Sequence, residues 1–382
     1  MNILITGAHG FIGKNLIASL KAIRNSQDNT AGSTDSLNIF EYDLDSDPAV
    51  LDCFCSNADF VIHLAGVNRP LTQEEFMDGN YGFTSILLDM LKKHGNTCPV
   101  MLASSTQAAL DNPYGQSKKA GEELLFAYAR ESGVRVLVYR FPNVFGKWCR
   151  PNYNSAVATF CHNIANDLPI TVNDRNHRMS LVYIDDVVAE LINALRLNES
   201  RNGAYCCVPV EYNVLLGDIV DLLYSFKSSR DNLSVSDMSD PFTKKLYATY
   251  LSYLPADSFS YMLKMNSDNR GSFTEILRTL NSGQFSVNIS KPGITKGNHW
   301  HHTKSEKFIV VSGSGVIRLR KVGTDDLYEY FVDGKKLESI SIPPGYTHSI
   351  ENIGEDDMVI VIWVNELFDQ KRPDTFYEEV LK

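Results

Sequence analysis

Residues 3–16, ILITGAHGFIGKNL, join an apolar strand to a helix through three glycines. In such a turn Gly7 permits the tight bend, Gly10 lets the backbone approach a pyrophosphate, and Gly13 lets the helix pack closely on the sheet. The N-terminus of the helix then faces the phosphates. The stretch therefore predicts a dinucleotide site in a βαβ unit, although three glycines alone also occur by chance.

The chain up to about residue 225 continues this alternation of strands and helices. Apolar strands are expected at residues 1–6, 59–66, 99–105 and 134–141, and helical periodicity covers residues 16–23, 86–91 and 122–133. This order predicts an α/β fold with a doubly wound parallel sheet. The polar, turn-rich residues 25–36 are expected to form a loop before the second strand.

The hydrophobic period changes to two in the last third of the chain. Residues 285–289 alternate, a Ser-Gly-Ser-Gly turn separates 307–311 from 316–320, and apolar runs follow at 337–345 and 358–364. Short strands with glycine turns predict an all-β barrel or sandwich. We therefore predict two domains, residues 1–245 and residues 246–382, the second beginning with a short linker helix.

Composition narrows the choice of partners and compartment. The 382 residues carry a formal net charge of −10, which argues against nucleic acid because a phosphate backbone is held mainly by clustered Lys and Arg. No apolar run approaches the ~18 residues of a membrane helix, and no charged leader precedes the first strand. We therefore predict a cytoplasmic protein without a membrane partner. The seven cysteines lack paired spacing and are expected to be reduced thiols.

A second motif supports the nucleotide site. Residues 112–125, NPYGQSKKAGEELL, place Tyr114 and Lys118 four positions apart on one helical face. A phenol whose pKa is lowered by a nearby ammonium can deliver a proton to a carbonyl as hydride arrives from a nicotinamide. A Tyr and a Lys at this spacing are also a common surface pair, but here they follow a glycine motif and a strand.

These stretches resemble the extended short-chain dehydrogenase/reductase family over about residues 1–245. The matching motifs are TGAHGFIG, HLAG, SST, YGQSK, FPNVFG and LVYIDDV. The resemblance implies a Rossmann-like fold in which a hydroxyl joins Tyr114 and Lys118 in catalysis. Ser105 is the preferred candidate, with Thr106 next, and Ser104 also lies in the motif. The implied cofactor-binding residues are Gly7, Gly10, Phe11, Ile12, Gly13, Leu64, Ala65, Gly66, Tyr114, Lys118 and Asn143.

Basic residues in the presumed substrate half are candidates for holding a diphosphate. Lys147, Arg150, Arg175 and Arg178 follow the FPNVFG motif, and we select Arg175 and Arg178 as substrate-binding residues. Solvated surface charges are the alternative for each of them.

Two arguments from the sequence favour different dinucleotides. Residues 39–47, IFEYDLDSD, hold Glu41 and Asp43 and no arginine. On charge alone this favours the free ribose of NAD over a 2′-phosphate. The enzymes that the chain resembles most use NADPH, so NADPH is the predicted cofactor.

A second candidate site lies in residues 293–313, GITKGNHWHHTKSEKFIVVSG. His299 and His301 point to one face of a strand while Trp300 points away. Glu306 follows after a bend and His348 comes from a later strand, giving three imidazoles and one carboxylate suited to Zn, Fe, Mn or Ni. We predict one divalent transition metal per chain, with zinc preferred; a histidine cluster without a ligand role is the alternative.

These residues resemble the cupin family. Gly293, His299, His301, Glu306 and Gly313 match its first motif, and residues 343–352, PPGYTHSIEN, match the second except that Leu337 stands where a glycine is usual. Residues 266–277, NSDNRGSFTEIL, resemble the opening of barrel enzymes that epimerise nucleotide-linked 4-keto-6-deoxy sugars, through Asp268, Arg270, Phe273 and Glu275. A hairpin with a surface salt bridge is the alternative reading of that stretch.

The full chain resembles the bifunctional capsular-polysaccharide and O-antigen nucleotide-sugar enzymes of the UDP-2-acetamido-2,6-dideoxy-L-talose dehydrogenase type. The resemblance lies in DNPYGQSK, FGKWCRPNYNS, SKPGITKGNHWHHTK and GYTHSIEN. It implies 3-epimerisation of a UDP-linked 2-acetamido-2,6-dideoxy-4-keto-hexose in the cupin half, then NADPH-dependent reduction at the 4-position. The product would lie on the route to UDP-N-acetyl-L-fucosamine.

The same resemblance implies a homodimer and leaves two points open. Tyr346 and His302 are the candidates for the base that removes the sugar proton. The alternative function is a 4-keto-sugar reductase whose cupin half only dimerises and holds a metal. A non-enzymatic dinucleotide sensor is disfavoured by Tyr114 and Lys118.

Overall fold

The structure is a computed structural model that describes residues 1–28, 37–279 and 281–382. Its contacts divide the chain into two compact units. The first contains residues 1–223 and 245–254, and the second contains residues 224–244 and 255–382. The boundary predicted between residues 245 and 246 falls inside helix α9 (Pro241–Leu251) and stays a prediction.

The first unit is built on a seven-stranded sheet of order β2-β1-β3-β4-β5-β9-β8, parallel except for its last pair. Strand β1 lies between β2 and β3, so the chain moves to one side of β1 to form β2 and crosses to its other side to form β3. Open α/β sheets bind ligands in the crevice at such a reversal of direction. The predicted doubly wound fold is confirmed. The strands are β1 (Asn2–Thr6), β2 (Asn38–Tyr42), β3 (Phe60–His63), β4 (Val100–Ser105), β5 (Val136–Phe141), β8 (Arg201–Asn202) and β9 (Tyr205–Cys206).

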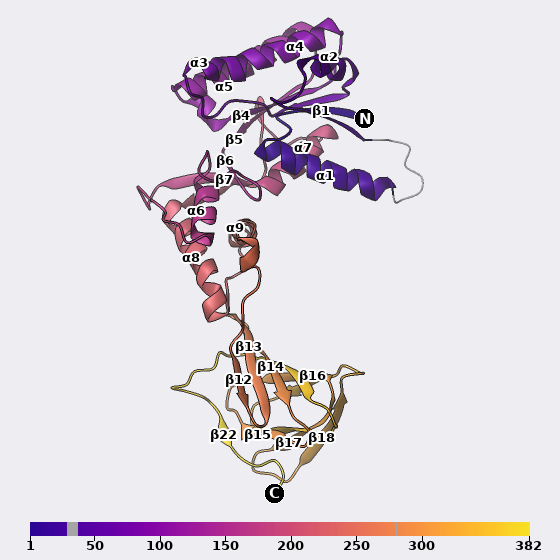
Figure 1. Ribbon diagram of the computed structural model, residues 1–382, viewed down its shortest axis with the longest axis vertical. Helices are drawn as coiled ribbons and strands as arrows, with labels where there is room; N and C mark the ends of the chain where they lie inside the picture. The colour runs from indigo at the N-terminus through magenta and orange to yellow at the C-terminus, as the bar shows by residue number, and fades with distance from the viewer. Residues whose placement is uncertain (29–36, 280) are drawn as a thin grey trace. The chain divides into compact units, whose positions relative to one another are not determined.

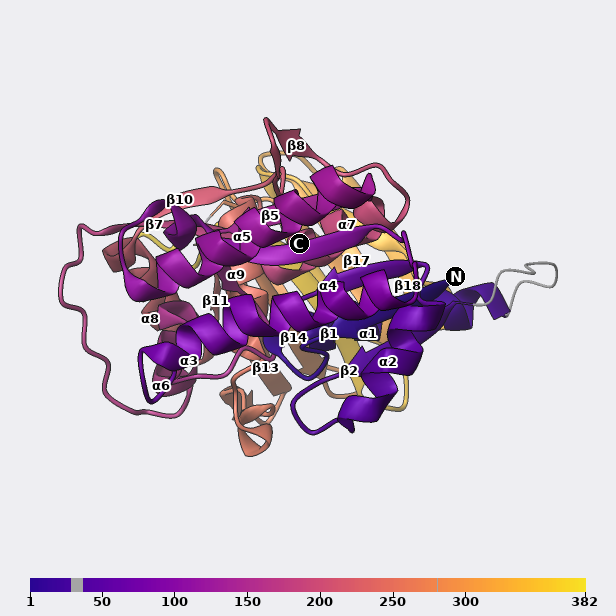
Figure 2. The ribbon, with the colours of Figure 1, turned by 90° about the horizontal axis from the view of Figure 1, so that it is seen from above.

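Helices cover both faces of this sheet (Figure 1). α2, α4 and α5 lie on one face, and α1 and α7 lie together on the other. Figure 2 shows α4 and α5 running alongside each other over the strands. The helices are α1 (Phe11–Asp28), α2 (Pro48–Asn57), α4 (Phe83–Lys93), α5 (Pro113–Ser132) and α7 (Ile184–Leu195).

Local sequence sets the ends of these helices. The side chain of Asn112 accepts a hydrogen bond from the backbone N–H of Gly115, Pro113 follows at the first position of α5, and Gly133 ends the helix with a φ of 72°. Helix α1 continues to Asp28, so the loop predicted at 25–36 is wrong for residues 25–28. Residues 29–36 of that loop lie outside the described residues.

Smaller elements complete the first unit. A three-stranded sheet of order β10-β7-β6 carries residues that follow β5 in sequence. Its strands and the remaining helical elements are β6 (Asn143–Phe145), β7 (Arg178–Tyr183), β10 (Tyr212–Leu215), α3 (Glu74–Met77), a π-helix (Asp78–Gly82), a 3₁₀ turn (Thr106–Ala109), α6 (Ala156–Ala165) and α8 (Leu216–Asn232), which continues into the second unit.

The second unit consists mainly of two facing sheets of short strands. One has the order β11-β13-β14-β21-β16-β19 with β12 beside β13, and the other has the order β18-β17-β20-β15-β22. Alternate side chains of both sheets, among them Phe308, Ile317, Ile350 and Ile360, form one buried core between them. The predicted all-β second part is confirmed.

The first four strands of the second unit belong to one sheet, and from β14 onward the chain crosses repeatedly between the two sheets. They are β11 (Ser234–Val235), β12 (Met265–Asp268), β13 (Gly271–Thr279), β14 (Gly283–Ser290), β15 (Thr295–Trp300), β16 (Glu306–Ser312), β17 (Ser314–Lys321), β18 (Leu327–Asp333), β19 (Ser339–Ile342), β20 (Tyr346–Asn352), β21 (Met358–Val364) and β22 (Phe376–Tyr377). A 3₁₀ turn, Ala256–Ser258, precedes them. Across both units, the described residues contain no helix with the length and apolar character needed to span a membrane.

Candidate functional site

The glycine loop lies directly against the segment that follows β3. Gly7 has a φ of 72°, and a Cβ there would lie 2.7 Å from the backbone N of Ala65. A Cβ on Gly13 would lie 2.3 Å from the carbonyl oxygen of Gly7, so α1 can begin this close to the strand only with glycine at that position. The structure thus brings Gly7, Gly10, Phe11, Ile12 and Gly13 next to Leu64, Ala65 and Gly66 at the carboxyl ends of β1 and β3.

Ser105, Tyr114 and Lys118 meet at the neighbouring strand end. Ser105 is the last residue of β4, and Tyr114 and Lys118 lie one turn apart on α5. The phenol of Tyr114 hydrogen-bonds with the side chain of Ser105. The ammonium of Lys118 lies 5.9 Å from the Tyr114 ring centroid and donates to the carbonyl of Ala103 at 3.2 Å. Among the hydroxyls considered, Ser105 is therefore the one beside the phenol.

The other two hydroxyls of this motif are engaged elsewhere or exposed. Ser104 is buried and donates to a carboxylate oxygen of Glu122 at 2.5 Å, and Thr106 is exposed. Glu122 also accepts two hydrogen bonds from the guanidinium of Arg140, at 2.9 and 2.6 Å. This ion pair ties α5 to β4 and β5 just behind the catalytic candidates.

Burial dominates the pKa values in this cluster. It lowers the pKa of Lys118 to about 8, and the negative charge of Glu122 opposes part of that effect. Burial raises the pKa of Tyr114, and only the hydrogen bond with Ser105 opposes it. The predicted lowering of the Tyr114 pKa by Lys118 is therefore wrong for this arrangement, in which the ammonium bonds to a backbone carbonyl and not to the phenol.

Asn80 belongs to this cluster and was missed by the sequence analysis. It lies in the π-helix, where its amide donates to the hydroxyl of Ser117 and to the carbonyl of Val67, both at 3.0 Å. A Cβ on Gly66 would lie 2.7 Å from Asn80 Oδ1 and 2.8 Å from Lys118 Nζ, so Gly66 allows both side chains to approach. A single π-helical turn has no periodic pattern of residues, so it could not be predicted from the sequence.

A pocket of about 760 Å³ opens near Asn143. Its charged and polar lining includes Arg69, Tyr153, Asp174 and His177. No ion pair involves Arg69 among the residues that the structure describes, so its guanidinium is available to a ligand. Neither of these basic residues, Arg69 and His177, was selected from the sequence.

The arginines selected from the sequence do not line this pocket. Arg175 forms two hydrogen bonds with the carboxylate of Asp221, both 2.7 Å long. Arg178 is exposed at the start of β7, and its neighbours His177 and Met179 line the pocket. Alternation along a strand directs the Arg178 side chain away from them. Lys147 is paired with Asp185, and Arg150 lies over the ring of Tyr153 at 5.1 Å.

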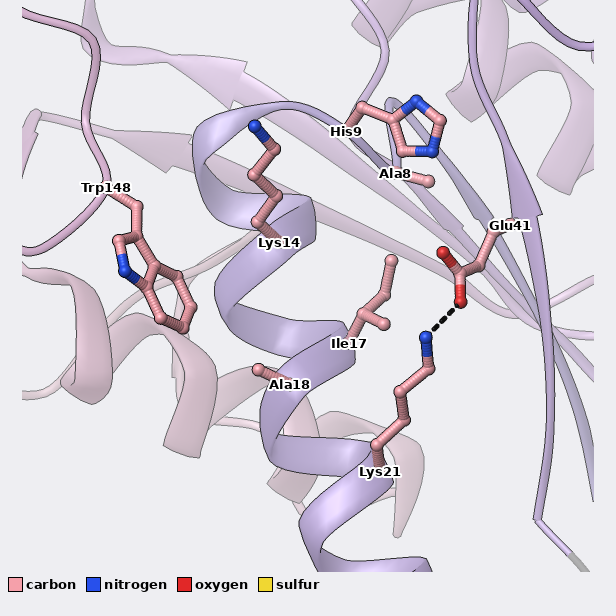
Figure 3. A pocket seen from close by; sticks show the side chains of 8 residues that line it. All are labelled: Ala8, His9, Lys14, Ile17, Ala18, Lys21, Glu41 and Trp148. Atoms are coloured by element: carbon pink, nitrogen blue, oxygen red, sulfur yellow. Dashed lines mark ion pairs between the residues drawn. The ribbon is translucent and has the colours of Figure 1, made fainter.

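A second pocket, of about 520 Å³, lies beside the glycine loop and the first turns of α1 (Figure 3). Its polar lining consists of His9, Lys14, Lys21 and Glu41. Figure 3 shows the ammonium of Lys21 directed at the carboxylate of Glu41, and these groups form a 2.7 Å ion pair.

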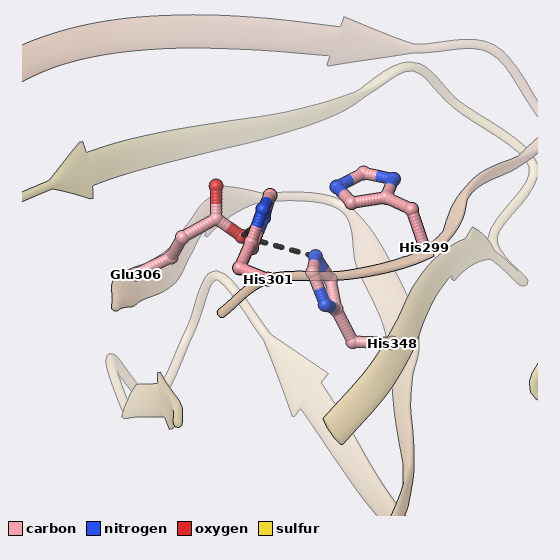
Figure 4. Close-up of side chains that lie close together, drawn as sticks. All are labelled: His299, His301, Glu306 and His348. Carbon is pink, nitrogen blue, oxygen red and sulfur yellow. Dashed lines mark ion pairs between the residues drawn. The ribbon is translucent and has the colours of Figure 1, made fainter. Parts of the chain in front are cut away.

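In the second unit, the four predicted metal ligands converge (Figure 4). His299 on β15 pairs with His348 on β20, and a bulge between Gly297 and His299 sets their register. One ligand atom from each of His299, His301, Glu306 and His348 lies within 4.8 Å of all the others. A carboxylate oxygen of Glu306 lies 3.0 Å from His348 Nε2 and 3.6 Å from His301 Nε2.

These atoms fit a metal ion better than they fit one another. The Nε2 atoms of His301 and His348 and the Oε2 atom of Glu306 are buried without a hydrogen-bond partner, which is costly unless another group satisfies them. Tetrahedral ligands bound at about 2.1 Å lie about 3.4 Å apart, close to the distances found here. Burial lowers the pKa of His299 to about 4, so its imidazole is neutral and able to bind a metal.

A backbone carbonyl fixes the orientation of one ligand. His301 donates from Nδ1 to the carbonyl of Asp374, which leaves Nε2 directed into the cluster. The Asp374 carboxylate accepts backbone N–H groups of His302, Thr303 and Lys304 at 3.0, 3.0 and 3.2 Å. The loop after His301 is thereby attached to the C-terminal segment, a contact that the sequence did not reveal.

The other sugar-site candidates of this unit lie outside the cluster. Asp268 and Arg270 form an exposed 2.7 Å ion pair at the β12–β13 hairpin, and Glu275 on β13 pairs with Arg278. Tyr346 packs on the core, and His302 is exposed and contacts Trp300. Phe273 lies on β13 opposite Asn288.

Two family models match the chain. The model described as "NAD dependent epimerase/dehydratase family" matches residues 3–208. The model described as "Polysaccharide biosynthesis C-terminal domain" matches residues 266–376. Together they include every catalytic and metal-binding candidate named above.

Individual relatives match over the whole length. A UDP-2-acetamido-2,6-beta-L-arabino-hexul-4-ose reductase of Pseudomonas aeruginosa is 43% identical over 98% of both chains. The crystal structure of the capsular polysaccharide assembling protein CapF from Staphylococcus aureus is 52% identical, with a TM-score of 0.92 and full coverage of both chains. A UDP-glucuronic acid 4-epimerase of Bacillus cereus, 21% identical, covers 66% of this chain and 98% of its own with a TM-score of 0.52, which shows the shared fold of the first unit.

Proposed function

Because the chain belongs to the NAD dependent epimerase/dehydratase family and is related along its entire length to nucleotide-sugar enzymes of polysaccharide synthesis, we propose that it converts one UDP-linked 4-keto sugar at two sites. The second unit inverts the carbon at position 3, and the first unit then reduces the ketone at position 4 with NADPH. The substrate is a UDP-linked 2-acetamido-2,6-dideoxy-4-keto-hexose and the product is UDP-2-acetamido-2,6-dideoxy-L-talose. The proposal includes a homodimer, which sedimentation velocity would test.

The reduction is assigned to Ser105, Tyr114 and Lys118. When bound, the nicotinamide supplies a hydride to the carbonyl carbon. Tyr114 gives its phenolic proton to the carbonyl oxygen, and Ser105, which hydrogen-bonds to the phenol, orients that oxygen. The ammonium of Lys118 stabilises the phenolate that remains. The loop around Gly7 and the segment from Leu64 to Gly66 hold the dinucleotide, and the pocket at Arg69 and Asn143 supports a place for the substrate.

The inversion is assigned to the second unit. A hydrogen next to a ketone is acidic because the charge left after its removal spreads onto the carbonyl oxygen. A divalent metal, zinc by its preference for imidazole and carboxylate ligands, would supply positive charge to that oxygen. His299, His301, Glu306 and His348 would hold it, and we propose a cupin fold for this unit on that ligand set.

The single observation that carries the two-site proposal is the buried ligand set. Three imidazoles and a carboxylate are directed at one point and leave buried atoms unsatisfied. The alternative, a reductase whose second unit holds a metal without catalysing, shares this geometry but predicts no chemistry there.

Proton NMR in heavy water separates these two functions. The UDP-linked 4-keto sugar is incubated with the protein, with and without NADPH. We expect loss of the signal of the proton at position 3 without NADPH, and a reduced product only when NADPH is added. Reduction without any exchange at position 3 would leave only the alternative.

A further inference from the structure

The 520 Å³ pocket beside the glycine loop raises the question of which dinucleotide this chain selects. Acidic residues at the end of the second strand of such folds hydrogen-bond the adenosine ribose of NAD. Glu41 and Asp43 are the acidic residues at this position. The charge argument for NAD therefore applies only if these carboxylates are available to hydrogen-bond the ribose.

Both carboxylates already have partners within the protein. Glu41 is held by the ammonium of Lys21 at 2.7 Å, from two turns along α1 (Figure 3). Asp43 accepts the backbone N–H of His9 at 2.7 Å with one oxygen and that of Leu44 at 2.8 Å with the other. Asp43 thus holds the backbone at His9 and Leu44 in place. The charge of Glu41 is neutralised by Lys21.

The pocket itself carries an excess of positive charge. Lys14 and Lys21 line it together with His9, and Glu41 is the one carboxylate among its lining residues, so the net charge is positive even with His9 neutral. No ion pair involves the Lys14 ammonium in the part of the chain that the structure describes. The pair between Lys21 and Glu41 is exposed, with side chains 46% and 33% accessible, and exposed pairs of this kind exchange partners at little cost.

We propose that Lys21 binds the 2′-phosphate of NADPH and leaves Glu41 to do so, while Lys14, two turns earlier on α1, adds positive charge to the same pocket. A phosphate monoester carries a charge of about −1.5 to −2 and three acceptor oxygens, so it complements an ammonium group in a positively charged pocket better than a ribose hydroxyl does. Lys21 is then the residue that determines cofactor specificity, and Glu41 competes with the phosphate for its ammonium. The inference rests on the proposed NADPH-dependent reduction.

Direct binding to the full-length protein tests this assignment without relying on turnover. NADPH and NADH are titrated by their fluorescence, and adenosine 2′,5′-bisphosphate and 5′-AMP serve as competitors that differ only in the 2′-phosphate. Lys21→Gln should weaken NADPH and the bisphosphate about tenfold or more, the usual worth of a charge-assisted hydrogen bond. NADH and 5′-AMP should change less than about twofold. Lys14→Gln should have the same selectivity with a smaller effect.

Two further variants make the outcome unambiguous. Glu41→Gln should strengthen NADPH binding and leave NADH binding unchanged, whereas an acidic residue that binds ribose would lose NADH affinity. Lys92→Gln is the matched control, because Lys92 is 47% exposed and forms a 3.1 Å pair with Glu131 away from the pocket. Equal losses of NADPH and NADH in Lys21→Gln, or no loss of either, would overturn the inference. If the wild-type protein still reduced the keto sugar with NADPH, the proposed function would be retained and only the assignment of Lys21 would be lost.

Discussion

At the scale of single residues, the candidate reductase residues lie close to one buried carboxylate, that of Glu122. Glu122 lies one turn beyond Lys118 on α5 and is almost fully buried. Its carboxylate is satisfied by Ser104 and Arg140, and its charge keeps the pKa of Lys118 from falling further than about 8. We therefore expect Glu122 to influence the proposed reduction through the pKa of Lys118.

This arrangement predicts the pH dependence of the reduction. Because burial lowers the pKa of Lys118 to about 8, the ammonium is present below that pH and is lost as the pH rises through it. The kcat/KM for keto-sugar reduction should therefore fall above about pH 8. Glu122→Gln removes the charge that raises the Lys118 pKa, so the alkaline limb should move to lower pH.

The control for this profile is Glu123→Gln. Glu123 is the exposed neighbour of Glu122, with a side chain 69% accessible, and its replacement should leave the limb in place. Circular dichroism would establish that both variants are folded. An unchanged alkaline limb in folded Glu122→Gln would remove Glu122 from this role.

The second prediction at this scale concerns the metal ligands. His301→Ala should lose most of a transition metal that the wild-type protein holds at about one per chain, because the three remaining ligands no longer complete the set. His302→Ala should keep it, since His302 is exposed and outside the cluster. Elemental analysis of the purified proteins measures both, and full metal retention in His301→Ala would exclude it as a ligand.

The sequence predicted these four residues because strand alternation and motif spacing specify which side chains share a face. The same reasoning could not find Arg69 and His177, which line the pocket at Asn143 from loops. Loop geometry depends on tertiary packing and leaves no period in the sequence. Arg175 was selected because its charge and its position suited a diphosphate ligand. Its actual partner, Asp221, lies 46 residues away in the sequence, so this ion pair could not be predicted.

At the scale of elements, the C-terminal segment supports the proposed metal site. Asp374 has a φ of 42° and joins the loop at His301–Lys304 to the strand β22. Arg320 donates to the carbonyls of Glu379 and Val380, and so fastens the end of the chain to β17. The candidate ligand His301 is thus oriented by Asp374, about seventy positions away.

Asp374→Ala should therefore weaken metal binding without removing a ligand. Its carboxylate accepts three backbone N–H groups, and their loss frees the loop that follows His301. Contacts of this kind change metal affinity by about 10- to 100-fold, which competition with a chelator would measure. Asp369→Ala is the control because Asp369 lies in the same segment and pairs only with exposed groups. Equal metal affinities in the two variants would argue against the supporting role.

The pocket near Asn143 and Arg69 allows a further comparison of two variants. Arg69→Ala should raise the KM for the UDP-linked sugar about tenfold or more, because a charged hydrogen bond to a diphosphate is lost. Arg175→Ala should change it little, since Arg175 is paired with Asp221. Steady-state kinetics at saturating NADPH measures both, and the opposite order would restore the assignment made from sequence.

The C-terminal end of α5 was predicted because one residue imposes it. The helical pattern at residues 122–133 stops at Gly133, which adopts a positive φ. No such residue lies in positions 25–28, and α1 continues through them. Polarity alone predicted a loop there, but a polar surface helix has the same composition.

At the scale of the whole molecule, each unit has a core and a candidate site of its own. Residues including Leu4, Leu87 and Leu125 form the core around the parallel sheet, and a separate apolar cluster fills the second unit. The change of hydrophobic period from 3.6 to two predicted an α/β part followed by an all-β part, because the period depends on which faces of a helix or strand are buried. The sequence did not reveal how residues 224–244 pack with the second unit, since that depends on the β11 contact with β13.

The central claim is that the two units perform different steps on one sugar, and a single NMR experiment on two variants tests it most directly. Tyr114→Phe removes the proton donor, so it should lose NADPH oxidation by about 10²-fold or more and still exchange solvent deuterium into position 3. His301→Ala should lose that exchange and still reduce a keto sugar already inverted at position 3. A mixture of both variants should restore full conversion. If folded, metal-loaded Tyr114→Phe lost deuterium exchange together with NADPH oxidation, the assignment of two sites would be contradicted.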